Sequence, residues 1–216
     1  MILSAVIFDL DGTVLANEDE WGEAFGKVLK SLGVKGVESF PHIGGIGIEE
    51  NWPMLIKKYN INTSKTPAEL TVKTLNEYHK LIPRITLNKG FVQFASEVKA
   101  SGILTALATS STWNTVQKVF GHIEIENYFD SVTTGEEVSY KKPDPEIFLM
   151  ASEKLGVDPG NCLVIEDSAA GIEAARKANM RVVAIVRDEK HAETLKKANL
   201  VVNNFPEITP DKIAAL

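Results

Sequence analysis

Two carboxylates separated by a single residue follow the first apolar segment of the chain. Asp9 and Asp11 come directly after the run 5–8, and Gly12 and Thr13 follow them. Two like charges at positions i and i+2 of a strand end repel one another, so a purely structural role explains them poorly. A divalent cation would neutralise the pair, and Mg²⁺ prefers oxygen ligands of this kind together with phosphate. A solvated turn is the alternative, which this short motif does not exclude by itself.

A group of hydroxyl side chains follows a second apolar segment. Thr109, Ser110 and Ser111 come after the run 103–108 and precede a segment with helical spacing. Hydroxyls and free N–H groups at the start of a helix form a site suited to phosphate. The alternative is that these residues only cap the helix.

A lysine and a second pair of acids complete the polar groups. Lys142 precedes Pro143, while Glu166 and Asp167 follow the apolar run 163–165. A lone lysine is more often a solvated surface charge, and adjacent acids often cap the next helix. The four groups are more informative together, because a parallel sheet would gather all of them at one edge.

Short runs rich in β-branched residues alternate with segments of helical spacing. The predicted strands are 5–8, 103–108, 163–165, 182–186 and 200–202. The predicted helices between them are 91–100, 113–120, 145–155, 169–178 and 192–197. This alternation indicates βαβ units and a parallel sheet covered on both faces, with ligands bound beyond the carboxyl ends of the strands.

One stretch, 17–83, interrupts the alternation with helical patterns and glycine-rich loops. Helical spacing runs from Trp21 to Gly33, and resumes over 52–59 and 68–81 after the loop 44–47. The sequence therefore predicts an α/β fold. Its Rossmann-like parallel-sheet core comprises residues 1–15 and 84–216, and a small α-helical cap, residues 16–83, is inserted after the first strand.

The composition is that of an ordinary globular protein and excludes few functions. Hydrophobic residues make up 44% of the 216 residues and charged residues 24%. The net charge of −6, with no block of Lys or Arg, argues against a nucleic-acid partner. Cys162 lies in an apolar run and is interpreted as a buried small hydrophobe. Without a basic leader or an apolar run of about 20 residues, we expect a cytoplasmic protein with no membrane partner, a monomer or weak homodimer.

Taken in order, the four polar motifs resemble those of the haloacid dehalogenase superfamily. The similarity is to the branch of β-phosphoglucomutase-like and phosphoglycolate-phosphatase-like enzymes, and it covers nearly the whole chain. The matching segments are 9–13 (Asp-Leu-Asp-Gly-Thr), 109–111 (Thr-Ser-Ser), 142–148 (Lys-Pro-Asp-Pro-Glu-Ile-Phe) and 164–172 (Val-Ile-Glu-Asp-Ser-Ala-Ala-Gly-Ile). The helical insert matches the cap of that branch in position and approximate length.

The resemblance implies a phosphatase that works through an aspartyl-phosphate. Asp9 is the expected nucleophile, and Asp11 is the expected acid and base. Thr109 and Lys142 are expected to bind the transferring phosphoryl oxygens, with Ser110 beside them.

The resemblance also implies the cofactor Mg²⁺. Its expected ligands are the carboxylates of Asp9 and Asp167 and the backbone carbonyl of Asp11, with Glu166 as an additional acid near the metal.

Cap residues are expected to contact the leaving group, and Trp21 and Gly45 are the candidates. Trp21, Phe25, Trp52 and the segment 46–48 are apolar or aromatic, so they either face the substrate or form the small core of the cap. His42, next to a proline, is interpreted as a loop residue.

Departures from the mutase pattern favour a phosphatase for a sugar phosphate or similar small monophosphate. Ala16 stands where mutases have an acid, Trp21 where they have a histidine, and the loop 45–49 lacks the arginine that binds a second phosphate. A phosphomutase remains the alternative. Asp11 argues against a 2-haloacid dehalogenase, and the complete set of motif residues argues against a non-catalytic binding protein.

Overall fold

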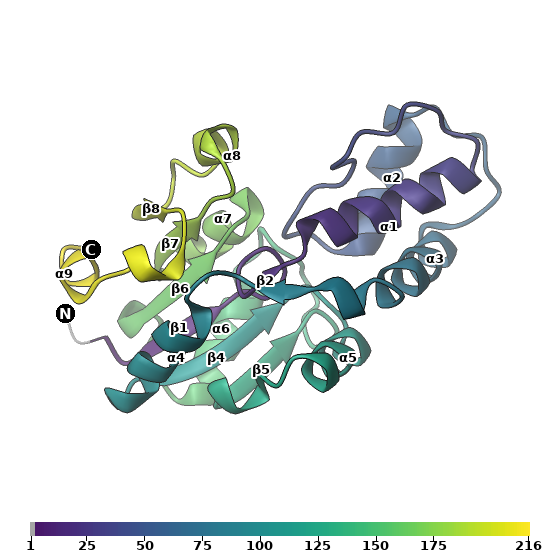
Figure 1. Ribbon diagram of the computed structural model, residues 1–216. Helices are drawn as coiled ribbons and strands as arrows, with labels where there is room; N and C mark the ends of the chain where they lie inside the picture. The colour runs from purple at the N-terminus through teal and green to yellow at the C-terminus, as the bar shows by residue number, and fades with distance from the viewer. Residues whose placement is uncertain (1–2) are drawn as a thin grey trace.

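The computed structural model describes residues 3–216 and contains one parallel sheet of six strands (Figure 1). The spatial order is β5-β4-β1-β6-β7-β8, and every neighbouring pair is parallel. The strands are β1 Ala5–Phe8, β4 Leu104–Thr109, β5 Ser131–Thr134, β6 Cys162–Glu166, β7 Arg181–Ile185 and β8 Leu200–Val202. This architecture confirms the predicted α/β, Rossmann-like fold class.

Alternate residues of β1 pack on opposite faces of the sheet, as the pleat of a strand requires. Val6 and Phe8 belong to one apolar cluster, and Ala5 and Ile7 belong to the other. Because all four side chains are fully buried, β1 is the centre of the core. The first cluster includes residues of α4 Phe91–Ala100 and α5 Trp113–His122, and the second includes residues of α6 Glu146–Leu155 and α7 Ala169–Lys177.

Three helices lie apart from the sheet and form the cap (Figure 1). They are α1 Glu18–Ser31, α2 Ile48–Lys58 and α3 Pro67–His79. Two short strands, β2 Leu15–Ala16 and β3 Thr86–Leu87, pair antiparallel, so the two chain segments leading to the cap lie side by side. The boundary of the cap at 16–83 stays a prediction, although the three helices fall inside it.

Several elements differ from the sequence predictions. Strand β5 was not predicted, because its residues Ser-Val-Thr-Thr carry neither an apolar run nor a clear alternation. The helix predicted at 192–197 begins earlier, as α8 Glu189–Thr194, because Asp188 caps it by accepting a hydrogen bond from the His191 N–H. The other unpredicted elements are the short strands β2 and β3, the helix α9 Pro210–Ala214 and the 3₁₀ turns Ile82–Arg84, Glu126–Tyr128, Pro159–Asn161 and Phe205–Glu207. Within residues 3–216, no helix combines the length and the apolar character that crossing a bilayer requires.

The aromatic cluster around Phe8 gives a stability prediction. Phe8 lies edge-on to Phe91 and Phe94, with ring centroids 5.7 and 6.1 Å away, and is fully buried. Phe8→Ala should lower the free energy of unfolding by about 3–5 kcal/mol, because it removes these contacts and leaves a cavity. Urea unfolding would measure the change. Tyr140→Ala, at a side chain that is 68% exposed, is the control and should cost less than about 0.5 kcal/mol. Equal losses at both positions would contradict the central place of Phe8.

Candidate active site

Polar residues meet at the carboxyl edge of the sheet, on either side of β1. Asp9 directly follows β1, Thr109 ends β4 and Glu166 ends β6. On one side of β1 the chain continues to β4 and β5, and on the other side it continues from β6 to β7 and β8. The connections after β1 and β6 therefore run in opposite directions, and a crevice forms between them. The Asp9 N–H donates to the Ile165 carbonyl at 2.9 Å, so the nucleophile candidate is held at the end of the β6 ladder.

Lys142 reaches this edge and contacts two carboxylates. Its Nζ lies 2.5 Å from Asp9 Oδ1 and 2.8 Å from Glu166 Oε1, and its side chain is fully buried. Burial alone would lower the pKa of Lys142, but the charges of Asp9 and Glu166 outweigh it and raise the pKa above its usual value. The two carboxylates therefore favour the charged form of the lysine, which comes from the loop that follows the unpredicted strand β5.

Both carboxylate oxygens of Glu166 have donors within the protein. Oε1 accepts from Lys142, while Oε2 accepts from the backbone N–H groups of Asp167 and Ser168 at 2.8 and 2.6 Å. A Cβ on Gly171 would lie 1.7 Å from Glu166 Oε1, so only glycine fits at this position in the first turn of α7. Glu166 is thus fixed against the lysine and the start of the helix.

Asp167 has the properties expected of a cation ligand. Its side chain is buried, and the hydrogen bond found for its carboxylate among residues 3–216 comes from Thr13 Oγ1 at a long 3.4 Å. Burial raises the pKa of Asp167, and the nearby negative charges of Glu18, Glu166 and Asp9 raise it further. This excess of negative charge calls for a positive partner.

The backbone of the first motif approaches Asp167 closely. Gly12 has a φ of +80°, and a Cβ there would lie 2.0 Å from Asp167 Oδ2.

Burial also raises the pKa of Asp9, against the opposing charge of Lys142. The described residues contain no group of three or more acidic, His or Cys side chains placed to hold a metal. The carboxylates of Asp9 and Asp167 and the backbone carbonyl of Asp11 nevertheless suit Mg²⁺, because this ion usually keeps several waters and binds substrate phosphate in addition to a few protein oxygens.

The carboxylate of Asp11 is hydrogen-bonded largely to the cap and its linker. Oδ1 accepts from Asn17 Nδ2 at 2.6 Å, Trp21 Nε1 at 2.9 Å and the Tyr78 hydroxyl at 3.3 Å. Oδ2 accepts from Ser111 Oγ at 2.7 Å. Burial and the charge of Asp11 raise the pKa of Tyr78 well above its usual value, so the phenol remains a donor. The orientation of Asp11 therefore depends on the cap.

Asn17, Tyr78 and Ser111 were missed as site residues by the sequence reasoning. Ser111 was one of three hydroxyls considered as helix caps, and nothing in the local sequence connects Tyr78 with a residue 67 positions earlier. The order of the motifs gave no signal for either contact.

The three hydroxyl side chains at the end of β4 do not cap the helix that follows. The N-cap of α5 is Thr112, whose side chain accepts from the Thr115 N–H. The capping alternative is therefore wrong for Thr109, Ser110 and Ser111. Thr109 Oγ1 accepts from the Ser111 N–H at 3.0 Å, and Ser110 Oγ donates to the carbonyl of Gly45, in the cap loop, at 2.8 Å.

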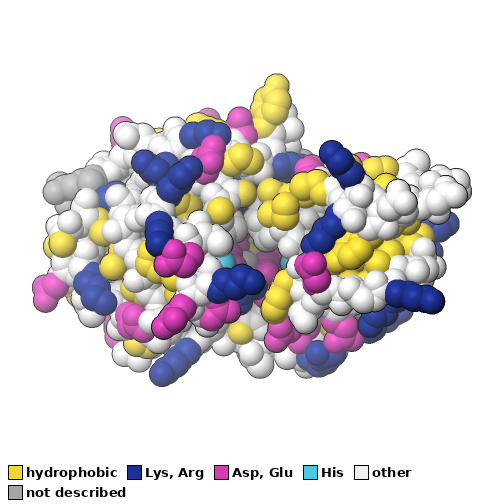
Figure 2. All heavy atoms as spheres, turned by 90° about the horizontal axis from the view of Figure 1, so that it is seen from above, with side chains coloured by type: hydrophobic (Ala, Val, Ile, Leu, Met, Phe, Trp, Pro, Cys, Tyr) yellow, Lys and Arg dark blue, Asp and Glu magenta, His cyan; other side chains and the backbone are white. Residues whose placement is uncertain are grey.

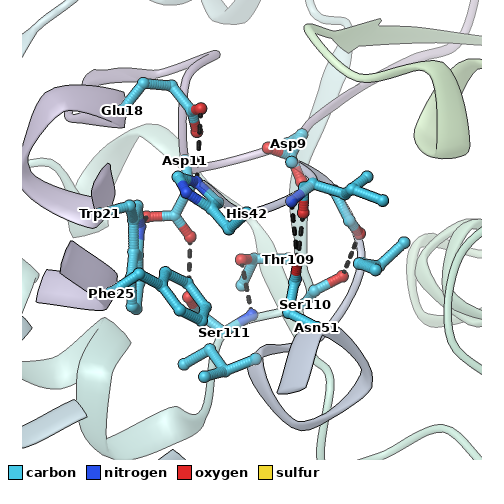
Figure 3. A pocket seen from close by; sticks show the side chains of 15 residues that line it. Asp9, Asp11, Glu18, Trp21, Phe25, His42, Asn51, Thr109, Ser110 and Ser111 are labelled. Carbon is cyan, nitrogen blue, oxygen red and sulfur yellow. Dashed lines mark hydrogen bonds and ion pairs between the residues drawn. The ribbon is translucent and has the colours of Figure 1, made fainter. Parts of the chain in front are cut away.

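A cavity of about 50 Å³ lies between these residues and the cap (Figure 3). This volume is enough for a few waters and smaller than a sugar. Figure 2 shows the corresponding hollow between the two lobes, with acidic and histidine side chains inside it. The residues lining the cavity are Asp9, Asp11, Glu18, Trp21, Phe25, His42, Ile43, Gly44, Gly45, Ile46, Ile48, Asn51, Thr109, Ser110 and Ser111.

Cap residues divide between the cavity and the interior of the cap. Trp21 and Phe25 line the cavity and also belong to the same buried apolar cluster as Trp52, so they fit both sequence interpretations. Trp52 is fully buried and does not line the cavity, whereas Gly45 does. His42, interpreted from sequence as a loop residue, also lines the cavity.

A family model and individual related sequences both indicate one protein family. The family model described as haloacid dehalogenase-like hydrolase matches residues 6–185. A phosphorylated carbohydrates phosphatase of Thermotoga maritima is 33% identical over 209 residues, which cover 95% of each chain. Hexitol phosphatase B of Escherichia coli K12 is 29% identical over 209 residues, covering 95% of this chain and 94% of that relative.

A solved structure supports the assignment to a branch of the family. The β-phosphoglucomutase of Clostridium difficile has a TM-score of 0.87 and 31% identity, and the match covers 100% of this chain and 96% of that one. The resemblance predicted from the motifs is confirmed. This chain therefore belongs to the haloacid dehalogenase-like hydrolase family and is a hydrolase.

Proposed function

We propose that this hydrolase is a Mg²⁺-dependent phosphatase that acts on a small phosphorylated carbohydrate through an aspartyl-phosphate on Asp9. The contact of 2.5 Å between Lys142 Nζ and Asp9 Oδ1 carries the proposal. The lysine charge favours the ionised form of Asp9 and offsets the repulsion between this carboxylate and a phosphate dianion. A buried ammonium beside a buried carboxylate at the switch point of the sheet suits phosphoryl transfer.

The proposed reaction has two displacements at phosphorus. Asp9 attacks phosphorus while the bond to the leaving oxygen breaks, and Asp11 gives its proton to the leaving alkoxide. The same Asp11 carboxylate then takes a proton from the water that hydrolyses the aspartyl-phosphate. Thr109 and Lys142 bind the phosphoryl oxygens. Asp9, Asp167 and the backbone carbonyl of Asp11 would hold Mg²⁺, which would supply further positive charge next to the phosphoryl group.

We assign Glu166 to Lys142 rather than to the metal. Both of its oxygens already accept hydrogen bonds from Lys142 and from backbone N–H groups. Its proposed task is to hold the ammonium group beside Asp9 and to fix the first turn of α7.

The cap side of the cavity favours a monophosphate over a bisphosphate. None of the described residues that line the cavity is Lys or Arg, while Glu18 contributes a negative charge. A second phosphate group would therefore meet no cation in the cap. The names of the Thermotoga and Escherichia relatives support a phosphorylated carbohydrate or hexitol as the substrate. The likeness to a β-phosphoglucomutase keeps a phosphomutase as the second candidate.

Substitution of the two aspartates tests the division of roles. Asp9→Asn should abolish phosphate release and any covalent phosphate, because the amide is not a nucleophile. Asp11→Asn should slow turnover by about 10²–10⁴-fold, the usual contribution of one acid or base. Phosphate release over a panel of sugar phosphates, with Mg²⁺ and with EDTA, would measure both.

Asp19→Asn is the matched control, since Asp19 is exposed on α1. Its activity should equal that of the unmodified enzyme. Substantial turnover by Asp9→Asn would show that another residue is the nucleophile, and activity unaffected by EDTA would refute the metal.

The buried charge of Asp167 leads to opposite effects on stability and metal binding. Asp167→Asn should raise the melting temperature in EDTA, because it removes a buried carboxylate with one long hydrogen bond. The same substitution should remove the stabilisation by Mg²⁺, which for a metal at 100 times its dissociation constant is about 2.7 kcal/mol. Differential scanning calorimetry with and without Mg²⁺ would measure both effects. An undiminished Mg²⁺ shift in the variant would place the metal elsewhere.

Docking of the cap loop onto the sheet edge depends on Gly45. The residue has a φ of +80°, and a Cβ there would lie 2.0 Å from Ser168 Oγ. Its carbonyl accepts the hydrogen bond from Ser110 Oγ at 2.8 Å. Any side chain at this position would therefore hold the cap away from the phosphate-binding residues.

Gly45→Ala should lower kcat/KM by at least about tenfold, because a misplacement of about 1 Å at a closing site has effects of this size or larger. Gly33→Ala is the control, since Gly33 has a similar φ of +85° with open space around it. It should lose about 1–2 kcal/mol of stability and keep its activity. Steady-state kinetics and urea unfolding would be measured on both variants. Equal kinetic losses would attribute the effect to backbone strain and not to cap docking.

A further inference from the structure

A histidine of the cap loop presents an unpartnered nitrogen at the cavity. The side chain of His42 is 6% exposed, and its ring stacks on Phe25 with centroids 4.9 Å apart and planes 11° apart. Its Nδ1 is buried and has no hydrogen-bond partner among the described residues, although the ring lines the cavity (Figure 3). Buried polar atoms are rarely left without a partner, because the loss amounts to about 1–3 kcal/mol.

The position of His42 is fixed by the loop that carries it. Asn51, which is almost fully buried, accepts from the Ile43 N–H at 2.7 Å and donates to the Ile43 carbonyl at 3.1 Å. The same side chain donates to the Gly47 carbonyl at 3.0 Å. With the loop tied to α2 and the ring stacked on Phe25, His42 cannot turn its free nitrogen towards bulk water without breaking these contacts.

The other ring nitrogen faces an acid that is itself held in place. His42 Nε2 lies 3.7 Å from Glu18 Oε2, and Arg187 Nη1 lies 3.0 Å from the same oxygen. Arg187 follows β7 and stacks over the ring of Phe40 in the cap, at 4.8 Å. In the neutral ring, the carboxylate favours the proton on Nε2, which leaves Nδ1 as a hydrogen-bond acceptor.

We infer that His42 is a specificity-determining residue that accepts a hydrogen bond from a hydroxyl of the leaving group. The inference rests on the proposed phosphatase activity and deepens it. The preferred substrates are monophosphate esters of sugars or polyols with a hydroxyl near the ester, and esters of alcohols without such a hydroxyl are poorer substrates.

The surroundings of His42 agree with this chemical class. Glu18 is a hydrogen-bond acceptor and carries a negative charge that disfavours a second phosphate. Trp21 and Phe25 line the cavity with apolar ring surface, which suits the C–H faces of a carbohydrate. A site built to hydrogen-bond a hydroxyl discriminates strongly against an analogue that lacks it, because the protein group is then left unpaired.

Three substitutions separate the two ring nitrogens. His42→Phe keeps a stacked ring and removes both nitrogens. His42→Asn keeps a polar atom near the position of Nδ1, and His42→Gln keeps one near the position of Nε2. Kinetics would compare sorbitol 6-phosphate and glucose 6-phosphate with p-nitrophenyl phosphate, whose leaving group has no hydroxyl near the ester.

His42→Phe and His42→Gln should lower kcat/KM for the sugar and polyol phosphates about tenfold, the effect of one lost hydrogen bond. Both should change kcat/KM for p-nitrophenyl phosphate less than about twofold. His42→Asn should recover part of the loss. His79→Asn is the control, because His79 contacts Thr115 outside the cavity. It should leave kcat/KM unchanged for both kinds of substrate.

Other results would overturn the inference, and they are distinct from failure of the proposed function. Equal losses on both kinds of substrate would mean that His42 only supports the loop, and unchanged kinetics in all variants would mean that it has no role. Either result leaves the phosphatase proposal intact. No phosphate release by the unmodified enzyme from either kind of substrate would overturn the proposed function and this inference with it.

Discussion

The buried ion pairs of Lys142 with Asp9 and Glu166 are the interaction on which the site depends. Removing charges from water is costly, and close pairing is what makes it tolerable. Here one lysine faces Asp9 at 2.5 Å and Glu166 at 2.8 Å, and Asp167 lies nearby with a raised pKa. One positive charge cannot offset three carboxylates. The folded chain therefore carries a local excess of negative charge at the point where a divalent cation and a phosphate would bind together.

The sheet and the cap contribute different kinds of constraint to this site. Strands β1, β4 and β6 are locked by parallel ladders, so Asp9, Thr109 and Glu166 have little freedom to move. Asp11 is different, because Trp21 and Tyr78, from cap helices α1 and α3, donate to its carboxylate. The residue proposed as acid and base thus takes its orientation largely from the cap, while the proposed nucleophile takes its own from the sheet.

The sequence predicts the sheet edge far better than it predicts the cap. Motif residues such as Asp9 and Glu166 end apolar strands, and the topology of a parallel sheet then brings strand ends together without further information. Contacts made by Tyr78 and His42 depend on how three helices and a loop pack against that edge. Prediction of short elements fails for a related reason. Strand β5 has only four residues, two of them threonine, and no apolar pattern.

The same division explains why the reaction class is easier to infer than the substrate. Phosphoryl transfer needs charges placed around one phosphorus atom, and strand ends supply them with little dependence on the rest of the chain. Leaving-group recognition depends instead on single atoms such as His42 Nδ1, whose position results from a stack on Phe25, a loop held by Asn51 and a carboxylate held by Arg187. On this proposal, substituting one of these supports changes which alcohol fits and leaves the proposed phosphate-binding residues in place. Specificity in such a fold can therefore diverge faster than chemistry.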